Sequence, residues 1–176
     1  DWSSDSERDS LIEEGIGNCR QQDDLVDLLY SYEPRVRRAA MRRLRRIMTP
    51  AVLDAFFKIS RDKPPANVEA VAEAMAQMLG DTAHDRAIKA LEHRDKAIRR
   101  AAEVFLMASP MNRKMVSLAS QWLEEPDPGR ARQVMEKIAT SLRDPQGDTS
   151  ELIKLVYTGV DHPDEHVRQQ GWRIIT

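Results

Sequence analysis

Four histidines are the residues of this chain best suited to metal binding or acid–base catalysis: His84, His93, His162 and His166. The last two lie four residues apart in the sequence HPDEH, and two histidines at that spacing on one helix face can hold a metal ion. Pro163, however, favours the start of a helix between them. We therefore expect two solvent-exposed histidines in a turn and no metal site.

The single cysteine, Cys19, offers little further chemistry. Arg20 adjoins it, but Asp23 and Asp24 follow, so its surroundings do not favour a reactive thiolate. A lone cysteine forms no internal disulfide, which fits a reducing compartment. We expect a structural or incidental thiol.

The usual signatures of catalysis are missing from the sequence. It contains no glycine-rich phosphate loop, no nucleophile elbow and no recognisable triad motif. Acidic residues are abundant, but most fall on polar helix faces, where water solvates them. The sequence therefore predicts a protein that is not an enzyme, with no catalytic residue, no metal and no cofactor.

Composition favours a helical chain. Of 176 residues, 41% are apolar, 32% are charged and 5% are aromatic, with 7 glycines, which suits one sizeable core or one short solenoid. No apolar run is long enough to span a bilayer and no charged-then-apolar leader appears, so we expect no membrane insertion and a cytoplasmic location. Because the chain starts without methionine, one hypothesis makes it a domain of a larger chain.

The most distinctive stretch is EPRVRRAAMRRLRRIM, residues 33–48. Its apolar residues recur at steps of three and four and define one helix face: Val36, Ala39, Ala40, Leu44, Ile47 and Met48. Five arginines share the opposite face, namely Arg35, Arg38, Arg42, Arg45 and Arg46, and Arg37 and Arg43 flank the apolar stripe. Pro34 suits the first helical turn, and Glu33 suits the positive end of the helix dipole.

Charge is distributed in blocks, although the net charge of the whole chain is only −2. Residues 1–33 carry ten acidic and two basic residues, a net charge of −8, whereas residues 34–63 carry ten basic and two acidic residues, a net charge of +8. Such an asymmetry predicts intramolecular attraction or a charged docking surface. One interpretation of the arginines is therefore a solvated face, or a clamp for the acidic N-terminal residues.

Hydrophobic periodicity places these residues on a series of short helices. We predict helices over residues 9–20, 23–31, 33–48, 51–60, 67–79, 83–91, 95–108, 116–123, 130–142, 152–157 and 165–175. Residues 1–8 are expected to be a frayed lead-in anchored by Trp2. Thr49 and Asp81 are expected to cap helices, Gly80 to end one, and residues 144–147 to form a turn. Short connections predict antiparallel helical hairpins without a sheet.

The second helix of each predicted hairpin repeats one local pattern. Five segments align, each with a pair of residues followed three positions later by a small or apolar one: Val36-Arg37 with Ala40, Val68-Glu69 with Ala72, Ile98-Arg99 with Ala102, Ala131-Arg132 with Met135, and Val167-Arg168 with Gly171. The steps are 32, 30, 33 and 36 residues, and an acidic residue precedes each pattern. A period of this length built from two helices is typical of a solenoid unit.

The clearest copy, DKAIRRAA at residues 95–102, fits the signature D-x-x-(V/I)-R-x-x-A. In this respect the chain resembles the short, bacterial-type HEAT repeats, over about residues 22–176 and five units. The resemblance implies an all-α, right-handed α-solenoid of about five HEAT-like hairpins. We accordingly divide the chain into an acidic N-terminal lead-in and capping helix, 1–21, and a HEAT-like repeat domain, 22–176.

The resemblance also implies roles for particular residues. Second helices would line a concave surface, and a structural ladder would join Arg37, Arg99, Arg132 and Arg168 to the turn acids Glu33, Asp95, Asp127 and Asp164. Glu69 stands where an arginine is expected, so the ladder should be interrupted there. Some HEAT-like enzymes bind iron through His-Glu dipeptides, which this sequence lacks.

The implied concave face is basic at one end and apolar in the middle, where Met75 also lies. Methionine and alanine beside arginine suit an acidic or amphipathic protein segment. We therefore predict a non-enzymatic protein-interaction scaffold with these binding residues: Arg38, Arg42, Arg45, Ala74, Met78, Arg100, Val104 and Met107. An open alternative is that tight curvature simply buries the apolar middle.

Two other functions stay open. The first is nucleic-acid binding, as in HEAT-like DNA glycosylases, with Trp2, Trp122 or Trp172 near a basic groove. The second is a cytoplasmic regulatory domain of a larger membrane protein. The sequence does not name the partner.

Overall fold

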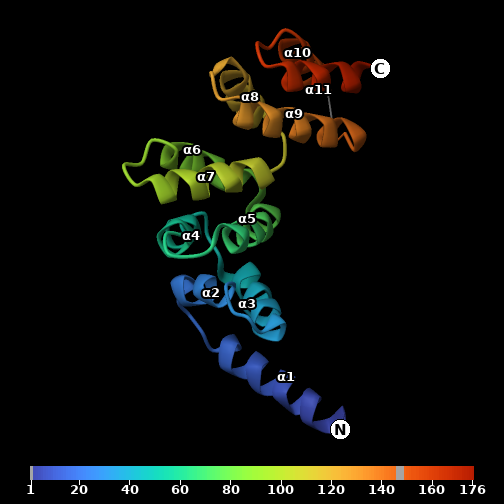
Figure 1. The fold of residues 1–176 in the computed structure, drawn as a ribbon. Helices are drawn as coiled ribbons and strands as arrows, with labels where there is room; N and C mark the ends of the chain where they lie inside the picture. The colour runs from blue at the N-terminus through green and yellow to red at the C-terminus, as the bar shows by residue number, and fades with distance from the viewer. Residues whose placement is uncertain (1, 146–148) are drawn as a thin grey trace. The chain divides into compact units, whose positions relative to one another are not determined.

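A computed structural model of the chain describes residues 2–145 and 149–176, with side chains from residue 6 onward. In these ranges the chain is helical and contains no strand, which confirms the predicted all-α class. The helices, labelled in Figure 1, are α1 (Trp2–Gly17), α2 (Gln22–Leu28), α3 (Pro34–Ile47), α4 (Val52–Ser60), α5 (Pro65–Leu79), α6 (His84–Ala90), α7 (Lys96–Ala108), α8 (Arg113–Glu124), α9 (Pro128–Arg143), α10 (Ser150–Val160) and α11 (Glu165–Ile175), with a 3₁₀ turn η1 (Gly80–Ala83) before α6.

The chain forms two compact units, Asp1–Ala108 and Ser109–Thr176. The division falls at the connection between α7 and α8. The sequence-based boundary after residue 21, which would separate α1 from the repeats, stays a prediction. Each unit is described below on its own.

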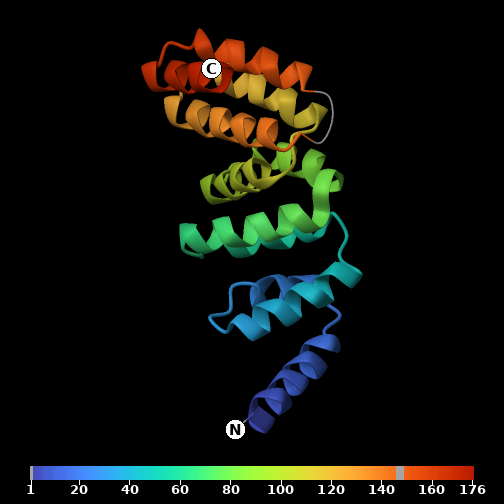
Figure 2. The same ribbon diagram turned by 90° about the vertical axis from the view of Figure 1, so that its right-hand side faces the viewer.

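The first unit holds three pairs of consecutive helices and the N-terminal helix α1. The pairs follow one another in chain order, and α1 lies against α3 (Figures 1 and 2). Neighbouring pairs are joined mainly by contacts of α4 with α2 and α7 and of α5 with α7.

The core of the first unit comes from the apolar faces that periodicity predicts. Nearly complete burial is shared by Leu25, Val26, Ala39, Ala40, Leu44, Leu53, Phe56, Ala72, Met75, Ala102, Phe105 and Leu106. Each large side chain among them contributes roughly 1.5–3 kcal/mol to stability. The Tyr30 hydroxyl lies 2.7 Å from Ser60 Oγ in this core, and burial raises the pKa of Tyr30 to about 12.

The second unit pairs α8 with α9 and α10 with α11, and glycine permits the closest helix approach. A Cβ on Gly171 of α11 would lie 2.8 Å from Val160 Cγ2 and 2.9 Å from the Val160 backbone nitrogen. At Gly159 the side chain of Met135 fills the space that a Cβ would need. The backbones of α10 and α11 therefore touch because Gly171 carries no side chain.

Turn acids set the start of four helices. The cap residues are Glu33 for α3, Asp95 for α7, Asp127 for α9 and Asp164 for α11. Asp164 Oδ1, for example, accepts hydrogen bonds from the backbone N–H groups of His166 and Val167, both at 3.1 Å. Such caps satisfy donors that the first helical turn leaves unpaired. By contrast, α5 follows Pro64 and starts without a side-chain cap.

The arginine four residues after three of these caps folds back over its own turn. Arg37, Arg99 and Arg168 each donate from Nη1 to two consecutive turn carbonyls, five and six residues earlier, at 2.6–3.1 Å. Among the described residues these arginines form no ion pair with a turn acid. The implied ladder of arginines and acids is thus wrong at three positions, because turn carbonyls are the nearer acceptors.

Several ion pairs connect successive helix pairs, and two of them involve a turn acid. Arg132 Nη2 lies 3.1 Å from Asp164 Oδ2, which is the one rung of the implied ladder that the described residues form. Arg61 Nε lies 2.8 Å from Asp95 Oδ2, although no pattern marked Arg61 for this role. Both acids therefore serve as a cap for one helix and a partner for the preceding pair.

A second contact, which sequence reasoning missed, completes the turns before α3, α7 and α11. The residue two places before the cap accepts the backbone N–H of the cap residue: Ser31 Oγ at 3.2 Å, and the Nδ1 atoms of His93 and His162 at 3.0 Å. The recurring pattern is serine or histidine, one residue, an acid, three residues, then arginine. It holds the turn and the helix start together.

Several local predictions were wrong. Helix α1 begins at Trp2, so residues 2–8 are helical rather than frayed. Asp81 lies within η1 and does not cap α6, and α4 starts without a side-chain cap from Thr49. Gly80 does end α5, with a φ of 52° that other residues rarely adopt. The Trp2 side chain and residues 146–147 of the predicted turn lie outside the described residues.

We predict that Asp164 makes unfolding of the second unit sensitive to acid. The hydrogen bond from Arg132, with those from Val167 and His166, holds the pKa of Asp164 below its usual value. The unfolded chain therefore takes up a proton first, and stability falls as pH drops below about 5. Asp164→Asn keeps a capping oxygen without titrating, so thermal unfolding between about pH 5 and pH 2 should lose part of its pH dependence. Arg132→Gln should have a similar effect; an unchanged pH dependence in both variants would refute this role.

We also predict that Gly171→Ala destabilises the chain by roughly 1–3 kcal/mol, because the new methyl group meets the backbone of α10. The matched control is Gly15→Ala in α1, where nothing lies within 4 Å of the added Cβ. That change should leave stability equal or raise it by about 0.5–1 kcal/mol. Urea unfolding measures both; equal stability of Gly171→Ala and the parent chain would contradict the close approach.

Candidate functional site

Two of the four histidines, His93 and His162, accept backbone N–H groups in turns. His162 is 4% exposed and its Nδ1 accepts the backbone N–H of Asp164, so the predicted solvent exposure of His162 is wrong. His166 is exposed, as predicted, and His84 is fully buried. The described residues contain no group of three or more His, Cys, Asp and Glu side chains placed to hold a metal ion.

The basic face of α3 is the strongest candidate for function in the first unit. Arg37 and Arg43 take structural roles, since Arg37 holds its turn and Arg43 Nε donates to the Cys19 carbonyl at 3.1 Å. Arg38, Arg45 and Arg46 point away from the core, are exposed and form no ion pair with another described residue. Exposed guanidinium groups without acidic partners attract anionic ligands.

Helix α1 covers part of this basic face. Asp9 Oδ1 lies 3.3 Å from Arg35 Nη1, and Glu13 forms an ion pair with Arg42. These pairs confirm the interpretation of the arginine helix as a clamp for acidic N-terminal residues. Arg42, one of the predicted binding residues, is therefore already engaged by an acid of its own chain.

A cleft of about 420 Å³ marks where α1 meets α3. It is lined by Asp9, Ile12, Glu13, Arg35, Arg38 and Arg42, so Arg38 and Arg42 lie together as predicted. Ile12 and Ile16 are half-buried, whereas Leu11 is 69% exposed. In the sequence, this contact is marked by two acidic residues four positions apart, Asp9 and Glu13, with Ile12 between them.

The remaining predicted binding residues lie on α5 and α7, which pack against each other. Ala74, Met78, Val104 and Met107 are half-buried, so the apolar middle is neither fully open nor closed. Met75, expected nearby on the same face, is fully buried and belongs to the core. Arg100 is exposed and forms no ion pair with another described residue. The described clefts join Arg38 and Arg42 to α1, not to these residues.

The tryptophans give little support for base stacking. Trp122 is buried in the second unit, and the Arg130 guanidinium lies over its ring, 5.6 Å from the centroid. Trp172 is exposed on α11, in the second unit, whereas the basic face lies in the first. Trp122 is therefore unavailable as a platform for a nucleic-acid base.

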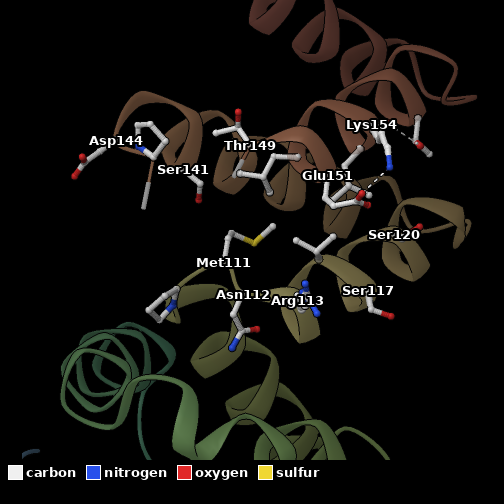
Figure 3. A pocket seen from close by; sticks show the side chains of 16 residues that line it. Met111, Asn112, Arg113, Ser117, Ser120, Ser141, Asp144, Thr149, Glu151 and Lys154 are labelled. Atoms are coloured by element: carbon white, nitrogen blue, oxygen red, sulfur yellow. Dashed lines mark hydrogen bonds and ion pairs between the residues drawn. The ribbon is translucent and has the colours of Figure 1, made fainter. Parts of the chain in front are cut away.

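A groove of about 1000 Å³ lies in the second unit between α8 and α10 (Figure 3). Its walls carry Asn112, Arg113, Val116, Ser117 and Ser120 from the start of α8 and Glu151, Leu152, Lys154, Leu155 and Thr158 from α10. Met111 lies between the two walls, and Ser141 and Asp144 close one end (Figure 3). The only hint in the sequence was the pair of small polar residues, Ser117 and Ser120, beside Val116.

The groove combines a hydroxyl-rich rim with an apolar floor. Leu152 and Leu155 form buried parts of the floor, and Lys154 Nζ is held by Glu151 Oε1 at 2.6 Å. The described lining residues include no histidine or cysteine. This groove can hold a small ligand or a peptide chain, but its chemistry does not specify which.

Lys137 is a perturbed basic group in the second unit that the sequence did not reveal. Its Nζ donates a hydrogen bond to the backbone carbonyl of Ser109, which is buried. Burial lowers the pKa of Lys137 to about 8. Lys137 therefore links α9 to the segment before α8, and burial of its ammonium group disfavours the charged form.

No model of a protein family matches the sequence, and no curated protein resembles it at a significant level. The likeness to HEAT repeats therefore rests on the repeat pattern alone. A bilayer-spanning helix is not found in the described part of the chain, since none combines sufficient length with sufficient apolar character.

Lys137 should make the chain more stable as pH rises above neutrality. The unfolded chain keeps a lysine pKa of about 10.4, so it binds more protons than the folded chain between that value and the folded pKa of about 8. Lys137→Met, which does not titrate, should flatten the rise in the free energy of unfolding across this window. Urea titrations of the parent chain and variant at several pH values measure it, and identical slopes would exclude the effect.

Proposed function

We propose that this chain is a HEAT-like helical-repeat scaffold, a short right-handed α-solenoid, that binds an acidic or amphipathic protein segment. The binding face is built on Arg38, Arg42 and Arg45 of α3 and continues toward Ala74, Met78, Arg100, Val104 and Met107. The proposal is for a non-enzymatic function.

One observation carries the proposal: an acidic helix of the same chain already lies on the arginine face. Asp9 and Glu13 of α1 pair with Arg35 and Arg42. In this contact an amphipathic helix lies on a protein surface, with acids that pair with arginines and half-buried isoleucines beside them. Exposed Arg38 and Arg45 leave further basic groups available to a ligand.

The repeat architecture is supported by the recurring turns. Acid caps precede four second helices, and the same serine- or histidine-containing turn appears before α3, α7 and α11. Repetition of one turn at nearly equal spacing is what a stack of similar helix pairs requires.

Nucleic-acid binding is the second candidate, and the density of unpaired arginines on α3 favours it. Phosphates would, however, compete with the carboxylates of Asp9 and Glu13 for the same guanidinium groups. Basic residues are also sparse at the matching positions of α5, where Ala70, Ala74 and Gln77 occur. A phosphate backbone needs a continuous basic track more than a protein segment does.

Binding measurements should distinguish the protein-binding function from the nucleic-acid-binding function. Labelled duplex DNA, single-stranded RNA and an acidic amphipathic helical peptide are titrated against the full chain at several salt concentrations. We expect the peptide to bind, and Arg42→Glu/Arg45→Glu to weaken it by about tenfold or more, because two attractive contacts become repulsive. Arg143→Glu/Arg173→Glu, exposed in the second unit, is the control of equal charge change.

Steeply salt-dependent nucleic-acid binding that disappears in Arg42→Glu/Arg45→Glu would favour the second candidate instead. Equal peptide affinity in the parent chain and both variants would overturn the proposed face.

A further inference from the structure

The contact between α1 and α3 is built like a ligand on its site rather than like a core. Along residues 6–17 of α1 only Ile12 and Ile16 are half-buried, and the other side chains are exposed. The acid–arginine pairs are also solvent-accessible, with Asp9 and Glu13 about half exposed. Solvent screens such pairs, so each contributes little to stability.

The order of the contacts shows how α1 lies on α3. Asp9 meets Arg35, Glu13 meets Arg42, and the Cys19 carbonyl accepts from Arg43, so the contacts advance in the same direction along both segments. Four residues of α1 correspond to seven of α3 between the two ion pairs. The two ion pairs are thus about one helical turn apart on α1 and about two turns apart on α3, so the two helices are not paired turn for turn.

Part of the basic face forms no ion pair with the described part of α1. Arg38 borders the cleft beside Asp9 and Glu13, Arg45 and Arg46 lie beyond it, and none of the three forms an ion pair with another described residue. A helix aligned with α3 and carrying acids one turn apart would reach Arg38, Arg42 and Arg45, which lie at i, i+4 and i+7. Of these three arginines, the described part of α1 forms an ion pair only with Arg42.

We propose that α1 is a displaceable intramolecular ligand, and that the partner is an acidic helix with the same chemistry as α1. The required features are carboxylates one turn apart and a β-branched apolar residue between them, as in Asp9, Ile12 and Glu13. The inference rests on the proposed function, because it assigns the occupant of that same basic face. It adds that α1 must leave before the partner binds.

The expected effect follows from competition. If α1 is docked in about nine of ten molecules, a partner sees only about a tenth of the sites, and its apparent affinity falls about tenfold. Releasing α1 from α3 should therefore raise the apparent affinity for the partner about tenfold. Reversing charge on α3 should abolish binding of the partner and docking of α1 alike.

The first test asks whether α1 is docked by these ion pairs. Hydrogen exchange of amides in residues 6–17 is followed in the full chain and in Arg35→Glu/Arg42→Glu. We expect faster exchange in the variant, because α1 loses its partners. Arg143→Glu/Arg173→Glu controls for net charge. Unchanged exchange would overturn docking of α1 whatever the outcome for the proposed function.

The second test uses α1 itself as the probe. A labelled, end-capped peptide of residues 2–18 is titrated against the full chain, Asp9→Lys/Glu13→Lys and Arg35→Glu/Arg42→Glu. We expect about tenfold tighter binding to Asp9→Lys/Glu13→Lys and none to the α3 variant. A peptide with Asp9→Asn and Glu13→Gln should bind poorly.

The outcomes distinguish the two claims. The peptide could bind the full chain and Asp9→Lys/Glu13→Lys equally well and fail to bind Arg35→Glu/Arg42→Glu. That result would overturn the claim that α1 blocks the binding face, but it would support the face itself. Binding to none of the three proteins, while hydrogen exchange reports a docked α1, would overturn the assigned partner chemistry.

Discussion

The helix pairs that end in α3, α7 and α11 depend on how the turn before the second helix is held. A short turn leaves N–H groups of the coming helix and its own carbonyls without partners. One acid satisfies the N–H groups, and one arginine satisfies two carbonyls, as Asp164 and Arg168 do before α11. The same acid can also receive an arginine from the preceding helix pair, as Asp164 does from Arg132. Polar groups at the turn thus fix both the hairpin and its neighbour.

The charge blocks of the first 63 residues make sense as a contact within the chain. The acidic block supplies α1, the basic block supplies α3, and their opposite charges meet at Asp9 with Arg35 and Glu13 with Arg42. Because these pairs are exposed, they set where α1 lies more than how stable the chain is. Stability comes instead from the apolar faces beneath, where Leu44, Phe56 and Phe105 are fully buried. Ion pairs and the half-buried Ile12 and Ile16 together hold α1 on α3.

Features that depend on hydrophobic periodicity could be predicted from the sequence. Features that depend on one particular side-chain contact could not. Apolar residues at helical spacing located the helices, and Asp95 and Asp164 were recognised as turn acids. The position of Arg168 was recognised too, but its acceptor was not, because a guanidinium reaches both carboxylates and carbonyls from the same place. Burial of His162 was missed for a related reason, since its neighbours Pro163 and Asp164 suggest a turn in water. The groove beside α8 depends on the distance between two helices, which no local pattern encodes.

Two of the four histidines serve in these turns as hydrogen-bond acceptors. At the turn before α3 a serine hydroxyl accepts the cap N–H, and before α7 and α11 an imidazole nitrogen does the same. Since serine can replace histidine in this role, acceptor geometry rather than acid–base chemistry is what the position requires. A nitrogen that accepts a backbone N–H is also unavailable as a metal ligand or general base. The Nδ1 atoms of His93 and His162 are thus committed to holding turns.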